Sequence, residues 1–150
     1  MNDFQDLYQE IVMDHNRRPR NFGKLNDATS FANGFNPLCG DEINVYLKLV
    51  GDEITDIAFD GDSCAISKSS ASMLTDGVKG KKISDAIQIF ESFREMITRK
   101  PGEEFSSDIL GDLEILSGVS QFPARIKCAT LPWHTFHTAL TENDQSVSTE

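Results

Sequence analysis

The sequence is 150 residues long, and its 39% apolar and 25% charged residues are typical of one compact globular domain. A formal net charge of −10 argues against nucleic-acid binding, which depends on phosphate neutralisation by Lys and Arg. No stretch approaches the roughly 20 apolar residues of a membrane span, and the acidic start resembles neither a secretory signal nor a transit peptide, so a cytoplasmic location is expected.

The first predicted element is an amphipathic helix over residues 3–15, because apolar residues recur there at the spacing of one helical face. A basic run follows it, and this run either docks an acidic partner or is a solvated turn: Arg17, Arg18, Arg20 and Lys24. Residues 24–42 are rich in Asn, Gly and Asp and have no helical period, which predicts irregular or edge structure.

A β-hairpin is predicted next, because apolar residues alternate from Ile43 to Leu49 and again at Ile57 and Phe59. Residues 51–53 supply the turn. With the turn centred on residue 52, paired residue numbers sum to about 104, which sets Val45 near Phe59 and Gly40 near Cys64. Cys39 and Cys64 should therefore flank the open end of one hairpin.

The rest of the chain predicts helices over about 65–77, 83–97, 109–116 and 123–140. Residues 141–150 are polar and are expected to form a disordered tail after a single domain of residues 1–140. The predicted fold class is α+β: a small antiparallel β-sheet packed on one face by helices.

The three cysteines, Cys39, Cys64 and Cys128, are a poor disulfide framework because they are odd in number and widely spaced. They are therefore buried small hydrophobes, metal ligands or reactive thiols. Cys39 lies in NPLCGD, where Asp41 can place a carboxylate beside the thiolate. Cys64 precedes a predicted helix, whose N-terminus stabilises a thiolate.

Cys128 lies in RIKCAT, where Arg125 and Lys127 would favour its ionised form, although a packed core thiol is the alternative. Lys68 is a further candidate cation. Three thiolates and one carboxylate match the tetrahedral preference of zinc, whereas an isolated Asp41 would be an ordinary turn carboxylate.

The remaining candidate ligands are the histidines, which are left out of the site. His15 ends the first helix and is expected to cap or pack. His134 and His137 share one helical face, but that face points away from Cys128 if the helix is continuous. Trp133 is expected in the core or at an interface.

The motifs NPLCGD, GDSCAISKSSASML and FPARIKCATLPW together resemble the U-type iron–sulfur cluster assembly family of NifU, IscU and SufU proteins. The resemblance extends from the DHNRRPRNFG segment to Trp133 and implies a SufE/NifU-like fold. The chain resembles the SufU branch, because residues 79–108 match its helical insertion. Lys127 also stands where the housekeeping scaffolds carry a His.

Resemblance to that branch implies a zinc-bound protein with Cys39, Asp41, Cys64 and Cys128 as ligands. Cys39 would accept persulfide sulfur from a SufS-like cysteine desulfurase and pass it to downstream iron–sulfur assembly proteins. The protein would then be at most a zinc-dependent sulfurtransferase, with Arg125 and Lys127 as auxiliary cations.

Two other functions use the same ligands. In the first, Cys39, Cys64 and Cys128 hold iron or a transient iron–sulfur cluster, as the family's scaffolds do. In the second, the zinc site is a structural module that mediates protein contacts. The ligand set alone does not separate these alternatives from sulfur transfer.

Overall fold

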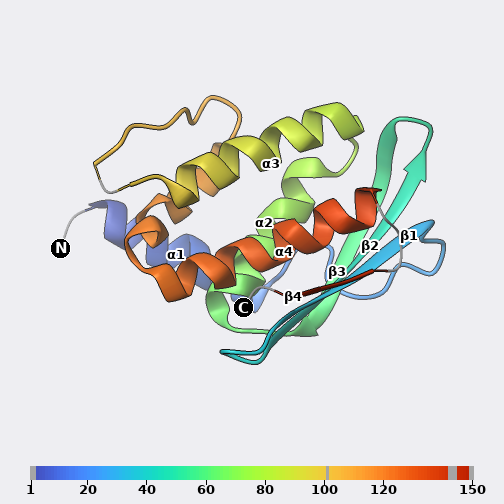
Figure 1. The fold of residues 1–150 in the computed structure, drawn as a ribbon, viewed down its shortest axis with the longest axis horizontal. Coiled ribbons are helices and arrows are strands. Elements are labelled where there is room, and N and C mark those ends of the chain that lie inside the picture. The colour runs from blue at the N-terminus through green and yellow to red at the C-terminus, as the bar shows by residue number, and fades with distance from the viewer. Residues whose placement is uncertain (1–2, 101, 142–144, 149–150) are drawn as a thin grey trace.

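The computed structural model describes residues 3–100, 102–141 and 145–148. Its elements in chain order are α1 (Asp3–Arg17), β1 (Ser30–Asn36), β2 (Asp41–Val50), β3 (Glu53–Asp62), α2 (Ala65–Val78), α3 (Ile83–Thr98), the 3₁₀ helix η1 (Gly111–Gln121), α4 (Pro123–Thr141) and β4 (Gln145–Ser148). The helices gather over one face of the sheet, and α4 crosses that face (Figure 1).

The sheet has the strand order β3-β2-β1-β4. The pairs β1–β2 and β2–β3 are antiparallel, and β4 joins β1 in parallel. Buried and more exposed residues alternate along β2, because one face of the sheet packs against the helices. The predicted α+β fold with helices on one face is confirmed.

The hairpin has the predicted register. Val45 pairs with Phe59 and Glu42 with Asp62, so the paired numbers sum to 104 along most of its length. A register shift between Lys48 and Leu49, next to the turn, is the one departure within the two strands. The hairpin therefore brings the start of β2 beside the end of β3, where the first two cysteines lie.

Strand β1 differs from the irregular or edge structure predicted for residues 24–42. It lies inside the sheet, with Ala32 paired to Val45 on one side and to Gln145 on the other. Small residues are needed in β1 because α4 crosses it closely. A Cβ atom on Gly34 would lie 1.9 Å from the Thr135 hydroxyl oxygen.

The structure also differs in part from the disordered tail expected for residues 141–150. Residues 145–148 pair with β1, whereas residues 142–144 and 149–150 lie outside the described residues. Main-chain hydrogen bonds at a sheet edge need no apolar side chains, so the polar composition gave no signal for this strand.

Trp133 is a core residue, with no exposed surface. Its ring stacks on Phe93 at a centroid distance of 4.8 Å, and its indole N–H donates to the Ser70 hydroxyl at 3.1 Å. Helix α4 continues through Pro132, so Cys128 shares one helix with His134 and His137. The predicted helices are present, although residues 111–121 form a 3₁₀ helix.

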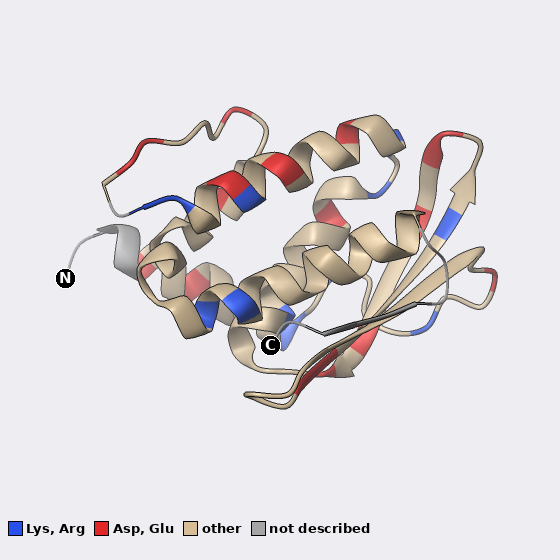
Figure 2. Cartoon of the chain, viewed as in Figure 1, with Lys and Arg blue, Asp and Glu red and all other residues tan. Residues whose placement is uncertain are grey.

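Acidic residues outnumber basic ones, 24 to 14, and are spread over helices and strands (Figure 2). Such a surface offers little attraction to a phosphate backbone. None of the helices in the described part of the chain combines the length and the apolarity that a bilayer span requires.

Candidate metal centre

Cys39 lies in the tight turn between β1 and β2, where it is exposed to solvent. The Asn36 side chain accepts the Leu38 N–H at 3.1 Å, and the Asn36 carbonyl accepts the Gly40 N–H at 2.8 Å. Gly40 has a φ of 76°, a left-handed conformation that glycine adopts without strain. The turn thus presents one thiol at the surface.

Asp41, the first residue of β2, holds the two hairpin cysteines together. It is only 2% exposed. Its Oδ1 accepts the Cys64 backbone N–H at 2.7 Å, and its Oδ2 accepts from the thiols of Cys39 at 3.1 Å and Cys64 at 3.3 Å. One oxygen is therefore committed to the backbone, and the other faces the sulfur atoms.

Cys64 is the N-cap residue of α2. Its sulfur accepts the backbone N–H of Ser67 at 3.5 Å, in the manner of a capping side chain. This contact confirms the prediction that Cys64 lies at a helix N-terminus. The N-terminal end of α2 therefore faces the thiol group.

Cys128 reaches the same place from α4. Its sulfur lies 3.8 Å from the sulfur of Cys39, and the residue is 8% exposed. Ligand atoms of Cys39, Asp41 and Cys128 all lie within 4.8 Å of one another, which is close enough to hold one metal ion. Cys64 adjoins this group through the shared Asp41 oxygen. We call these four residues the thiol cluster.

Burial has the largest effect on the acidities of the two inner thiols, Cys64 and Cys128. Burial raises the pKa of the Cys64 thiol, outweighing the lowering effect of the Ser67 N–H. Burial and the neighbouring thiols also raise the pKa of Cys128. The expectation that Arg125 and Lys127 favour the ionised form of Cys128 stays a prediction, and in the metal-free chain burial acts in the opposite direction.

The candidate cations are placed differently from one another. The Arg125 guanidinium lies over the Phe122 ring at 5.0 Å, and the Lys68 ammonium lies over the Phe22 ring at 5.0 Å. Lys127 is half-buried beside Cys128. Two of the three cations thus contact aromatic rings rather than the thiols.

The donor set fits a metal ion that prefers sulfur. Three thiols and a carboxylate converge from three elements, and four such donors satisfy the tetrahedral coordination of zinc or the thiolate ligation of iron. The raised thiol pKa values fit the same conclusion. A bound cation supplies the positive charge that buried thiolates need.

The histidines lie elsewhere, as expected. The Nδ1 atom of His15 is 2.6 Å from the Ser72 hydroxyl. The rings of His134 and His137 pack on Phe90 at centroid distances of 5.8 and 5.2 Å. Among the described residues, the ligand atoms that gather within 4.8 Å of one another come from Cys39, Asp41 and Cys128, and none comes from a histidine.

Two residues at the site were missed in the sequence. Leu38 is 75% exposed directly before Cys39, and only its place within NPLCGD could have indicated this. Ser67 donates its backbone N–H to Cys64, and the i+3 spacing from a helix N-cap is the signal that could have found it.

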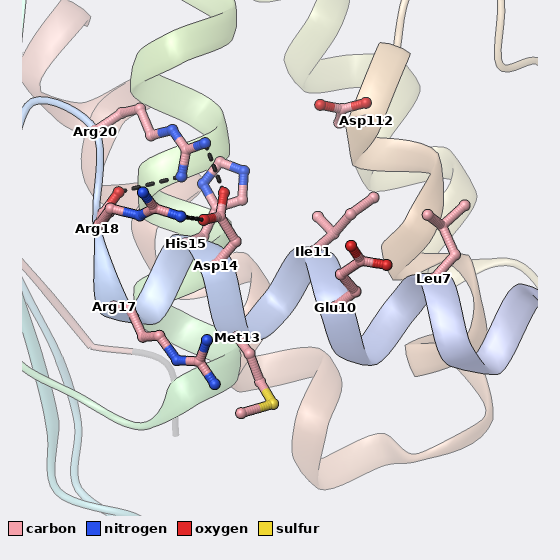
Figure 3. Close-up of a pocket in the computed structure, with 10 residues that line it drawn as sticks. All are labelled: Leu7, Glu10, Ile11, Met13, Asp14, His15, Arg17, Arg18, Arg20 and Asp112. Carbon is pink, nitrogen blue, oxygen red and sulfur yellow. Dashed lines mark hydrogen bonds and ion pairs between the residues drawn. The ribbon is translucent and has the colours of Figure 1, made fainter.

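Three residues of the basic run, Arg17, Arg18 and Arg20, line a separate pocket of about 490 Å³ beside α1 (Figure 3). Arg18 and Arg20 both pair with Asp14, at 3.0 and 2.7 Å, so their charges are partly compensated within the chain. None of the cysteines lines this pocket. It is therefore distinct from the thiol cluster.

Comparison with known families gives a match over most of the chain. Residues 7–129 match the family described as "NifU-like N terminal domain". This range includes every residue of the thiol cluster.

Individual proteins are similar over nearly the same length. The chain is 48% identical to "Zinc-dependent sulfurtransferase SufU" of Bacillus subtilis, over 85% of this chain and 84% of that protein. It is 42% identical to "Iron-sulfur cluster assembly scaffold protein IscU" of Streptococcus pyogenes, over 89% and 82%. A crystal structure of a putative SufU scaffold protein from Fervidobacterium islandicum superposes with a TM-score of 0.82 at 33% identity, covering 91% of this chain and 98% of that one.

Proposed function

This chain belongs to the family of NifU-like N-terminal domains, and we propose that within it the protein acts as a sulfur carrier of the SufU type. In this proposal it binds zinc at Cys39, Asp41, Cys64 and Cys128. It accepts persulfide sulfur at Cys39 and delivers that sulfur to iron–sulfur cluster assembly. The similarity to a relative named as a zinc-dependent sulfurtransferase supports this choice.

The difference in exposure among the three thiols carries the proposal. Cys39 is exposed at a turn, Cys64 is half-buried and Cys128 is buried, yet the sulfur atoms of Cys39 and Cys128 are only 3.8 Å apart. A zinc site with four protein ligands has no open coordination position, so a partner reaches it only where a ligand is exposed and can be exchanged. Here the exposed Cys39 can contact a partner protein while the more buried ligands retain the metal.

The transfer step is an exchange between sulfur atoms. The Cys39 thiolate attacks the terminal sulfur of a persulfide on the partner, and a new S–S bond forms at Cys39. The S–S bond to the partner's cysteine breaks, and that cysteine leaves as a thiolate. One S–S bond replaces another, so the step requires no external oxidant or reductant.

Zinc, when bound, would keep the ligand thiols deprotonated at neutral pH and make Cys39 available as a thiolate. The protein's own contribution is positional. Asp41 Oδ1 is fixed by the Cys64 N–H, so Oδ2 stays directed at the sulfur atoms. A carboxylate is a harder, more exchangeable ligand than a thiolate, which suits a site that must open.

The proposed sulfur donor is a SufS-like cysteine desulfurase, and the proposed recipients are downstream iron–sulfur assembly proteins. Leu38, 75% exposed beside Cys39, offers such a partner an apolar contact at the point of transfer. Because the three thiols must stay reduced to act, we place the protein in the cytoplasm.

Metal analysis of the purified protein, combined with a desulfurase assay, tests the proposal. We expect about one tightly bound zinc per chain and a cysteine desulfurase whose turnover rises when the protein is added. His134→Ala is the control and should retain zinc, because that side chain packs on Phe90. A stable iron–sulfur chromophore without zinc would support the scaffold function instead.

A further inference from the structure

Helix α2 carries a row of buried hydroxyl groups, nearly all of which have hydrogen-bond partners. Ser69 donates to the Val12 carbonyl at 3.0 Å, and Ser70 donates to the Ala129 carbonyl at 2.6 Å. Ser72 binds His15, and Thr75 donates to the Ser72 carbonyl. The bonds of Ser69 and Ser72 attach α2 to α1, and that of Ser70 attaches it to α4, whereas the Thr75 bond lies within α2.

Ser67 is the exception. Its residue has no exposed surface, and its Oγ is the one buried side-chain oxygen or nitrogen without a hydrogen-bond partner in the part of the chain that the structure describes. Buried hydroxyls are almost always hydrogen-bonded, so an unpaired one needs a physical reason. Serine in a helix commonly bonds a carbonyl one turn back, and Ser67 makes no such bond.

The position of Ser67 suggests that reason. It lies one helical turn after Cys64, and its backbone N–H already donates to the Cys64 sulfur at 3.5 Å. Ala71 and Leu74, further along the same helical face, are buried and apolar. Cys64 is therefore the polar end of a face that is otherwise apolar, and its sulfur already accepts a hydrogen bond from the backbone of Ser67.

We propose that Ser67 is a positioning residue whose hydroxyl donates a hydrogen bond to the Cys64 sulfur when that sulfur binds the metal. The inference rests on the proposed function, since it requires Cys64 to be a metal ligand. In the structure the Cys64 thiol donates its own proton to Asp41 Oδ2, and a thiol sulfur is a weak acceptor. A thiolate is a strong one, and it would give the Ser67 hydroxyl the partner that it lacks.

The Cys64 thiolate would then accept hydrogen bonds from two donors of one residue, the backbone N–H and the hydroxyl of Ser67. Hydrogen bonds of this kind fix the orientation of a metal ligand and tune how strongly it donates. Cys64 would stay a firm ligand while the exposed Cys39 is released for sulfur transfer. Ser67 would thus determine which thiolate leaves.

The test uses full-length Ser67→Ala, with Ser69→Ala as the matched control two residues away. Zinc affinity is measured by competition with a chromophoric chelator, and the thiolate-to-metal charge-transfer band is recorded with cobalt(II). We expect Ser67→Ala to weaken zinc binding about tenfold and to shift the cobalt band to lower energy, because a thiolate without its donor is more electron-rich. Metal-free Ser67→Ala should be as stable as the unmodified protein, since no hydrogen bond is lost.

Ser69→Ala should show the opposite pattern: lower stability, because a bond to α1 is lost, with unchanged zinc affinity and cobalt spectrum. Unchanged affinity and spectrum in Ser67→Ala would overturn the inference, as would equal weakening in both variants. These outcomes require that the unmodified protein binds zinc. Absence of zinc binding at the thiol cluster contradicts the proposed function itself, so the two failures are distinguishable.

Discussion

Replacing Asp41 by Asn separates the structural role of this residue from its proposed role as a ligand. The side chain keeps its shape and one acceptor oxygen, which can still accept the Cys64 backbone N–H. It loses its charge and the anionic Oδ2 that faces the thiols of Cys39 and Cys64. The substitution therefore removes a metal ligand while leaving the turn largely intact.

The two effects differ in magnitude. In the metal-free protein the lost contacts are hydrogen bonds from weak thiol donors, and a buried charge disappears with them. We therefore expect the free energy of unfolding to change by no more than about 1 kcal/mol. Zinc affinity should fall by roughly 100-fold or more, because loss of a ligand exceeds the effect of losing a hydrogen bond to a ligand.

Chelator competition measures the zinc affinity, and urea unfolding of the metal-free protein measures stability. Asp60→Asn is the matched control. Its carboxylate lies on the same hairpin and accepts hydrogen bonds from Asn44 at 2.9 Å and Tyr46 at 3.1 Å, without contacting a cysteine. Normal zinc affinity in Asp41→Asn, or equal losses in both variants, would refute Asp41 as the fourth ligand.

Two further predictions concern stability. Gly34→Ala should lower the free energy of unfolding by about 1–3 kcal/mol in urea titrations, because the new methyl group overlaps the Thr135 hydroxyl; unchanged stability would mean that α4 does not press on β1. Burial, and after it the charge of Arg20, lowers the pKa of His15 below its unfolded value of about 6.5. The contribution of His15 to stability is therefore full above about pH 6.5 and is lost as the pH falls below that value. His15→Gln should reduce this loss, measured as the difference in the free energy of unfolding between neutral and acidic pH. An equal difference in the unmodified protein and the variant would contradict the prediction.

The hairpin was predictable because its information is local. Alternation from Ile43 onwards and a turn at residues 51–53 determine the register, and Val45 pairs with Phe59 as expected. The proximity of Cys39 to Cys64 follows from that register. The proximity of Asp41 to these cysteines was also predictable, because Asp41 is two residues from Cys39.

Strand β1 and Cys128 were less predictable because tertiary packing places them. The SFANGFN sequence of β1 has the composition of a loop, and it forms a strand because β2 lies beside it and α4 needs small residues beneath it. The approach of Cys128 to Cys39 depends on how α4 crosses the sheet, for which the sequence alone offers only family resemblance. The same packing raises the thiol pKa that the adjacent Lys127 was expected to lower.

The central claim is that Cys39 is the sulfur acceptor, and mapping of persulfide after reaction with a cysteine desulfurase tests it most directly. Zinc-loaded protein is incubated with the desulfurase and cysteine, its thiols are alkylated, and the peptides of Cys39, Cys64 and Cys128 are weighed. We expect one additional sulfur atom on Cys39 and none on the buried Cys128. Sulfur found on Cys64 or Cys128 while Cys39 stays unmodified would contradict the account.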